Sequence, residues 1–262
     1  RFAVLAVTGS LVGTIGIGYT MATFHIWAPT VPFVGVVVLT AAALAVSVPR
    51  DLAELRRAGL VRRETARSRW STTATVTALS LGGLVVVVVA ALTHMGDPVP
   101  AGLFGSLGPG LVVGLALVVA AAVIALVRGR ALAVPVVVLG GVVQLAQAIT
   151  YGVPTVTAAA RHIGVVEYIR QFGGTNPSAD IFQTWSGLFA GAAWVADVGG
   201  IVNTILIAAW VPVLLAFSTT IAVGVLAAHW LPGARRPWIA ALLTAMTGSL
   251  NTTYFSPQSV GI

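Results

Sequence analysis

Seven apolar stretches of membrane-spanning length recur along the chain. They cover residues 2–22, 31–49, 72–93, 103–127, 131–152, 201–228 and 237–253. A helix needs about 20 mostly apolar residues to cross a hydrocarbon layer about 30 Å thick. The pattern therefore predicts an all-α, polytopic helical membrane protein with about seven transmembrane helices.

The positions of the basic residues predict the orientation of these helices. All basic residues are arginines, and 12 of the 14 fall within four places, namely Arg1, 50–70, Arg128–Arg130 and 231–237. Strict alternation of seven spans puts these places on one side and leaves only Arg161 and Arg170 on the other. Cytoplasmic loops carry the excess of positive charge. We therefore expect a multi-pass protein of the plasma (inner) membrane with a cytoplasmic N-terminus.

Composition excludes several other classes of protein. The chain is 58% hydrophobic and only 8% charged, and it has no cysteine. A soluble domain carries about 25% charged residues, and a disulfide framework or thiolate metal site needs cysteine. The net charge of +7 is not accompanied by a nucleic-acid-binding module or stacking aromatics, so no nucleic-acid partner is expected. The segment 50–70 is interpreted as a loop with a short surface helix on anionic membrane lipids.

The two ends of the sequence indicate a piece of a longer protein. The chain begins with Arg1 rather than Met, and Val260-Gly-Ile262 resembles the start of another apolar segment.

Residues 153–200 form the long extracytoplasmic loop of this topology. Two helices separated by 173–177 are expected there. The first is amphipathic, with an apolar stripe of Val156, Ala159, Ala160, Ile163, Val166 and Ile169 and a polar face of Arg161, Tyr168 and Gln171. Such a helix lies in the membrane interface. The second is expected from Ala179 to Trp194, with Asn176 as its cap and Pro177 in its first turn.

Ionisable residues gather on this outer side. They are Asp97, Glu167, Asp180, Asp197, His94 and His162. Charges near hydrocarbon are costly unless they are paired or solvated, so they indicate a site. Structural alternatives remain open: Asp180 would interact with a helix dipole, Glu167 would pair with Arg170 three residues on, and His162 would hydrogen-bond at headgroup level. Binding of a divalent metal by His162, Glu167 and Asp180 is a further alternative, but these residues have no recognised metal-ligand spacing, so neither a metal nor a cofactor is assigned.

Several short motifs together resemble a known family. They are His162-Ile-Gly-Val-Val-Glu-Tyr-Ile169, Asp180 followed by Trp185, Gly187 and Phe189, Trp210-Val-Pro212, Arg235-Arg-Pro-Trp238 and Tyr254-Phe-Ser-Pro-Gln258. In order and spacing, residues 148–262 resemble large actinobacterial membrane glycosyltransferases of the GT-C superfamily, whose donors are polyprenyl-phosphate sugars.

The resemblance implies a division of the chain and a catalytic residue. Residues 1–130 would be an accessory four-helix bundle, and 131–262 would begin the GT-C-like module. Asp180 matches the catalytic Asp of the first extracytoplasmic loop. The family pattern also has an Asp before the Tyr-Phe-Ser-Pro-Gln element, where this chain has Thr253.

The implied reaction moves a sugar from a polyprenyl phosphate to a hydroxyl of a cell-envelope glycan or lipid. It needs a carboxylate base, cations for the leaving phosphate and a groove for the lipid. Asp180 would be the base, and Arg161 or Arg170 would bind the phosphate. The remaining substrate-contacting residues are expected to be His162, Tyr168, Trp185, Tyr254 and Gln258.

Two other function classes stay open. A flippase or transporter of lipid-linked sugars would show intramembrane charges or broken helices in matched halves. A non-catalytic assembly subunit would need no precisely placed Asp180. Residues 254–258 also have a purely structural interpretation, as an aromatic belt followed by a helix stop.

Overall fold

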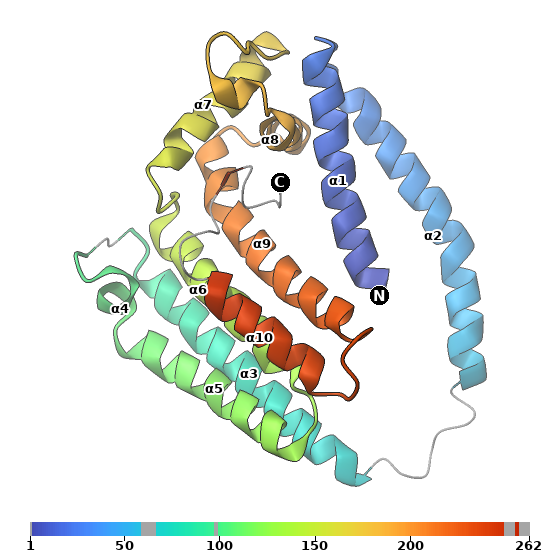
Figure 1. Ribbon diagram of the computed structural model, residues 1–262, viewed down its shortest axis with the longest axis vertical. Coiled ribbons are helices and arrows are strands. Elements are labelled where there is room, and N and C mark those ends of the chain that lie inside the picture. Colours follow the sequence, from blue (N-terminus) through green and yellow to red (C-terminus); the bar gives the residue numbers. More distant parts are fainter. Residues whose placement is uncertain (1, 59–66, 97–98, 249–254, 257–262) are drawn as a thin grey trace.

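The expected all-helical architecture is confirmed. The computed structural model describes residues 2–58, 67–96, 99–248 and 255–256, and within these ranges it contains helices and turns but no strand (Figure 1). The helices are α1 (Phe2–Thr23), α2 (Thr30–Ala58), α3 (Arg67–Thr93), α4 (Gly102–Leu107), α5 (Pro109–Arg128), α6 (Ala133–Tyr151), α7 (Ala158–Phe172), the 3₁₀ turn η1 (Ile181–Gln183), α8 (Gly187–Gly199), α9 (Thr204–Ala227) and α10 (Arg236–Gly248).

Four helices of the described part are long and apolar enough to cross a membrane. They are Thr72–Thr93 in α3, Pro109–Arg128, Ala133–Tyr151 and Thr204–Ala227. Many of their large apolar side chains point away from the protein interior, where only lipid tails would shield them from water. The chain is therefore a helical membrane protein in contact with membrane lipids.

Three of the predicted segments differ in detail. The stretch 103–127 is broken at Gly108, whose φ of 50° ends α4, and Pro109 then begins α5 because its missing N–H costs nothing at a first helical position. Residues 50–58 continue α2 and do not start a separate surface helix. Helix α10 has 13 described residues, and the rest of that predicted segment, 249–253, lies outside the described residues.

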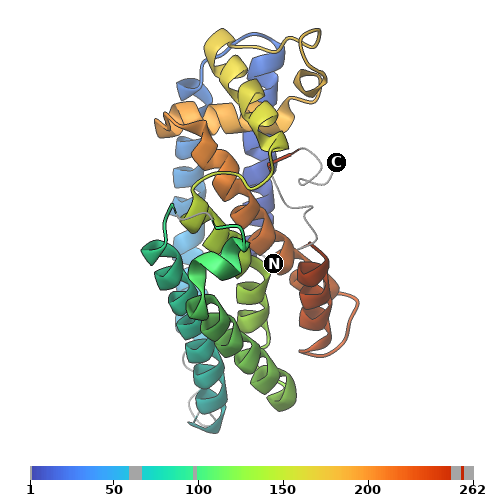
Figure 2. The same ribbon diagram turned by 90° about the vertical axis from the view of Figure 1, so that its left-hand side faces the viewer.

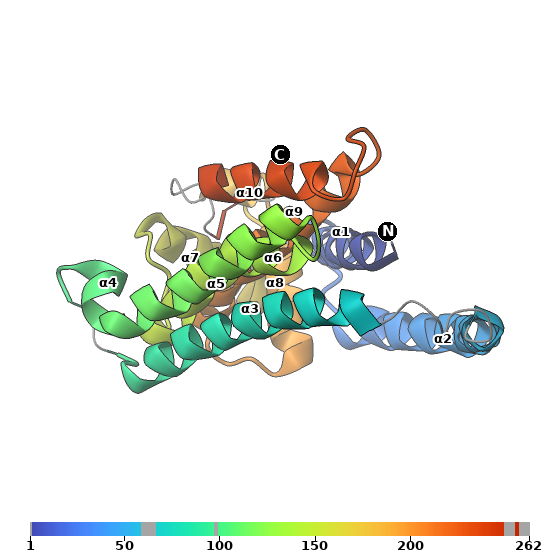
Figure 3. The same cartoon turned by 90° about the horizontal axis from the view of Figure 1, so that it is seen from below.

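Three apolar clusters hold the helices together. Two lie among α3, α4, α5, α6 and α10, and contain residues such as Val87, Val142 and Ala241. The third joins α1, α7, α8 and α9 with Phe255. Seen from below, α3, α5 and α6 lie side by side while α2 stands apart (Figure 3). Helices that precede residue 130 thus pack against helices that follow it. The division into two modules stays a prediction.

Helix α8 lies across the long helices, as Figure 2 shows. It approaches α1 so closely that a Cβ on Gly18 would lie 2.4 Å from the carbonyl carbon of Ala190. A Cβ on Gly191 would lie 3.1 Å from Cα of Ile15. Glycines let two helix backbones pack at this distance. Helix α1 therefore packs against the end of the molecule that carries α7 and α8.

Some of the loops that the sequence assigns to opposite sides lie at opposite ends of the molecule (Figure 1). At one end, the turn after α5 meets the loop after α9: a Cβ on Gly129 would lie 2.6 Å from Nη2 of Arg235. At the other end lie α7, η1 and α8 (Figure 1), and Phe255 packs against Phe189 there. We call this second region, comprising residues 24–29, 158–204 and 255–256, the α7–α8 end.

Candidate functional site

Helix α7 carries two candidate residues, Arg161 and His162, on different faces. Its buried side is formed by Ala159, His162, Val165, Val166 and Ile169, and Arg161 points outward. The predicted apolar stripe is confirmed at Ala159, Val166 and Ile169 and wrong at Ala160, which is exposed. His162 takes part in the buried face instead.

The second predicted helix starts later than expected. Residues 181–183 form a single 3₁₀ turn, and α8 begins only at Gly187. Asn176 does not cap a helix; its backbone N–H donates to Oε1 of the buried Gln183 at 2.6 Å. The cap is Asp180, whose Oδ1 accepts from the N–H of Phe182 at 2.9 Å. Asp180 thereby satisfies the N–H of Phe182 at the start of η1. Because the backbone of Asp180 is extended, no helix can run continuously from Ala179 into η1.

Asp180 and Arg161 form a two-point ion pair. Nε of Arg161 donates to Oδ2 of Asp180 at 2.7 Å, and Nη2 donates to Oδ1 at 3.1 Å. The guanidinium also lies 5.0 Å from the ring centre of Phe182, within range of a cation–π attraction. The Arg161 side chain is 60% exposed and that of Asp180 is 18% exposed. The pair therefore sits at the surface with its carboxylate partly covered.

The contacts keep both partners charged. The hydrogen bond from Arg161 lowers the pKa of the Asp180 carboxyl, and the N–H of Phe182 lowers it further. The same hydrogen bond raises the pKa of Arg161. Asp180 is thus an ionised carboxylate at neutral pH, which is the state that a proton acceptor needs.

His162 lies beneath this pair, inside the protein. Its side chain is 2% exposed, and its Nδ1 lies 2.6 Å from the carbonyl oxygen of Phe255. Because a carbonyl can only accept, Nδ1 carries the proton. The ring meets Phe182 edge-on with centres 4.6 Å apart and Phe189 at 5.2 Å. His162 therefore hydrogen-bonds inside the protein, where it ties the 255–256 segment to α7.

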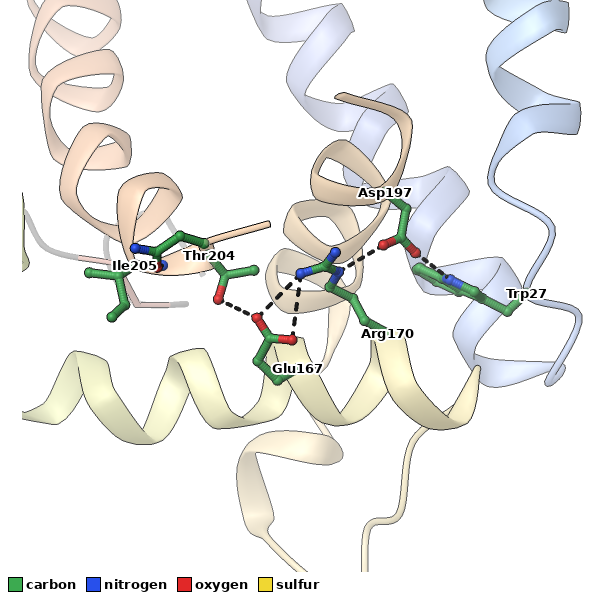
Figure 4. A network of polar contacts seen from close by, with 7 residues as sticks. Trp27, Glu167, Arg170, Asp197, Thr204 and Ile205 are labelled. Carbon is green, nitrogen blue, oxygen red and sulfur yellow. Dashed lines mark hydrogen bonds and ion pairs between the residues drawn. The ribbon is translucent and has the colours of Figure 1, made fainter. Parts of the chain in front are cut away.

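A second charged cluster joins four segments of the α7–α8 end (Figure 4). Arg170 donates from Nε to Oδ1 of Asp197 at 2.7 Å, and its Nη1 lies 3.3 Å from Oε1 of Glu167. Trp27 Nε1 donates to Oδ2 of Asp197 at 2.8 Å. Thr204 Oγ1 donates to Oε1 of Glu167 at 2.6 Å. The cluster fastens the α1–α2 loop, α7, α8 and α9 to one another.

The pairing of Glu167 with Arg170 confirms the structural alternative raised by their spacing. The pairing of Arg170 with Asp197, and that of Asp197 with Trp27, were missed. Asp197 is 27 residues from Arg170 and 170 residues from Trp27, so no local pattern connects them. The hydrogen bond to Asp197 raises the pKa of Arg170, which stays charged within the cluster.

The other candidate residues occupy different surroundings. Tyr168 is half-buried and packs on Phe172, with ring centres 4.6 Å apart. Trp185 follows η1 and is 56% exposed. Tyr254 and Gln258, like Thr253, lie outside the described residues, whereas Phe255 and Ser256 are buried. The fold thus brings Arg161, Asp180 and His162 together around the ring of Phe182, and holds Arg170 in a separate cluster.

Metal binding has no local support in the described ranges. Groups of three or more His, Asp or Glu side chains able to hold an ion do not occur there. No family model, curated protein or solved structure matches the chain.

Proposed function

We propose that the protein is a membrane glycosyltransferase. It moves a sugar from a polyprenyl-phosphate donor to a hydroxyl of a cell-envelope glycan or lipid, at the outer face of the plasma membrane. The observation that carries this proposal is the ionised Asp180 carboxylate, held at the surface of the α7–α8 end by Arg161 and the N–H of Phe182. The sequence resemblance over 148–262 supports the same assignment.

The chemistry follows from the charges of this pair. Asp180 would take the proton of the acceptor hydroxyl while the hydroxyl oxygen forms a bond to the anomeric carbon of the sugar. The bond from that carbon to the phosphate oxygen breaks, and the phosphate leaves with the bonding electrons. A guanidinium beside the leaving group stabilises the charge that develops there.

Orientation is part of this proposal. The α7–α8 end would face outward, and the arginine-bearing turns around Gly129 and Arg235 would face the cytoplasm. The supporting observation is that these two turns touch each other at the end opposite α7 (Figure 1). That arrangement agrees with the distribution of positive charge in membrane proteins.

One observation favours a second candidate, a non-catalytic assembly subunit. Both carboxylate oxygens of Asp180 are engaged, by Arg161 and by a backbone N–H, as in a purely structural cap. Transport is less well supported, because the candidate spans contain no charged residue before the terminal Arg128, and α9 continues through Pro212.

The Asp180→Asn variant of the full-length protein separates these functions. Asn caps a turn as well as Asp does, so the variant keeps the bond to Phe182 N–H while losing the base. Transfer of labelled sugar from a polyprenyl-phosphate donor, measured in membranes, should fall by at least about 100-fold. Glu167→Gln removes one carboxylate from α7, at the same end of the molecule, and serves as the matched control. If Asp180→Asn transfers sugar at the wild-type rate at equal expression, Asp180 is not the base and the protein is better described as an assembly subunit.

A further inference from the structure

The two arginines of the α7–α8 end are held in different ways. The Arg170 side chain is 20% exposed, and its partner Asp197 is 21% exposed. Glu167 and Trp27 extend that cluster. Arg161 is 60% exposed and has a single acidic partner. The two pairs should therefore respond differently to a competing anion.

Exposure decides which pair can change partners. Exposed ion pairs contribute little net stability because water solvates the separated charges well. Separating a partly buried pair leaves a charge without compensation, which is much more costly. The exposed Arg161 guanidinium is therefore open to an incoming anion, whereas the Arg170 guanidinium is covered and is held by both Glu167 and Asp197.

Asp180 keeps its position when Arg161 changes partner. Its Oδ1 also accepts from the N–H of Phe182 at 2.9 Å, and this cap does not involve the guanidinium. Arg161 is positioned separately, by the Phe182 ring 5.0 Å away. A planar guanidinium presents paired N–H groups that match phosphate as well as carboxylate. Both groups would therefore stay adjacent with an anion bound.

Two exposed apolar side chains follow Asp180 closely in the chain. Ile181 is 58% exposed, and Trp185 is 56% exposed. Large exposed apolar side chains in the segment that carries the carboxylate suit a ligand with a charged head and a hydrocarbon tail. This observation favours a lipid-borne phosphate over a free one.

We propose that Arg161 binds the phosphate of a prenyl phosphate ester, and that this phosphate displaces Asp180 from the guanidinium. The exchange of partners is argued from the geometry of the pair, whereas the prenyl identity of the ligand and the role of the released carboxylate rest on the proposed function. Donor binding would then free the base beside the reacting sugar. Without the hydrogen bond from Arg161, the pKa of Asp180 would rise toward its ordinary value and the carboxylate would become a stronger proton acceptor. The charged or titratable groups facing Asp180 are Arg161 and His162.

Binding of farnesyl phosphate to the full-length protein, in nanodiscs of zwitterionic lipid, tests the exchange. Arg161→Gln should weaken binding by at least about tenfold, because it removes a charge-assisted pair of hydrogen bonds. Asp180→Asn should tighten binding, by up to about fivefold, because it removes the competing carboxylate. Arg128→Gln, which removes an exposed arginine from the other end, should leave affinity unchanged. A gain in affinity cannot come from misfolding, so the Asp180 variant tests the exchange even if Arg161→Gln does not fold.

Two further ligands distinguish the source of the phosphate. Inorganic phosphate should bind more weakly than farnesyl phosphate, since it lacks the chain that Ile181 and Trp185 would contact. Phosphatidylglycerol in the nanodisc should not displace farnesyl phosphate. Equal affinity for inorganic phosphate, or displacement by phosphatidylglycerol, would overturn the assignment to a prenyl phosphate.

The failure of this inference differs from the failure of the proposed function. Unchanged binding by Arg161→Gln, or weaker binding by Asp180→Asn, overturns the exchange even if Asp180→Asn abolishes transfer. Tighter binding by Asp180→Asn together with normal transfer would uphold the exchange of partners and show that Asp180 is not the catalytic base.

Discussion

The imidazole of His162 donates a hydrogen bond to the carbonyl oxygen of Phe255, 93 residues further along the chain, at 2.6 Å. The ring of Phe255 is itself buried and contacts Phe189 with centres 5.7 Å apart. A short segment after α10 therefore completes the interior of the α7–α8 end.

Replacing Phe255 with Ala should lower the free energy of unfolding by about 3 kcal/mol, because it leaves a cavity against Phe189 and removes buried apolar area. Thermal unfolding of the purified protein in detergent would measure the loss. Phe104→Ala, at an exposed position, is the matched control and should change the midpoint little. A loss at Phe255 no larger than that at Phe104 would show that the 255–256 segment does not stabilise this end.

The cluster around Arg170 should depend on Trp27. The Trp27→Phe variant keeps the aromatic ring and loses the bond to Asp197, so it should destabilise the protein by about 1.5 kcal/mol. Trp210→Phe, on a largely exposed side chain of α9, should have a much smaller effect. A double-mutant cycle with Asp197→Asn should give a non-additive result, because the two residues share one bond. Additive losses would mean that Trp27 acts through packing alone.

The contact between α1 and α8 depends on a missing side chain. Gly18→Ala would place a Cβ against the backbone of Ala190, and the resulting overpacking should cost about 1–3 kcal/mol. Gly16→Ala, where a Cβ would meet nothing within 4 Å, should leave stability unchanged or raise it slightly, because Ala favours helix. Chemical denaturation of both variants would test this, and equal effects would show that α1 tolerates displacement from α8.

Acid should remove the contribution of the Arg161–Asp180 pair. The native pKa of Asp180 is lowered from its ordinary value of 3.8, so the stabilisation is present above that value and disappears as pH falls through the lower native one. The difference in melting temperature between wild type and Asp180→Asn should be constant above about pH 5 and shrink toward about pH 3. Arg161→Gln should show the same trend. A difference that stays constant across this range would mean that the pair is not formed in solution.

The hydrophobic pattern was sufficient to predict the long apolar helices, although not all of their bounds. Spans such as 131–152 and 201–228 correspond closely to α6 and α9, because long apolar runs leave few alternatives to a helix in a membrane. The break at Gly108–Pro109 was missed, since apolar residues on both sides hide it from a pattern based on hydropathy.

Tertiary contacts within the α7–α8 end could only partly be predicted. The pairing of Glu167 with Arg170 follows from helical spacing. The burial of His162 does not, because an amphipathic pattern treats imidazole as polar. Its burial requires a carbonyl from Phe255 and two phenyl rings, none of which is close in sequence. The bond from Trp27 to Asp197 likewise depends on how α1 and α8 cross.

The position of Phe255 also bears on how the protein is made. The apolar cluster it completes includes Ala22, so its members leave the ribosome at widely separated times. Helices inserted earlier must remain in the bilayer without the contacts of Phe255 to His162 and Phe189 until the later segment arrives. Nascent chains arrested before residue 255 should therefore be trapped by membrane chaperones or cleaved by quality-control proteases far more readily than those arrested after it.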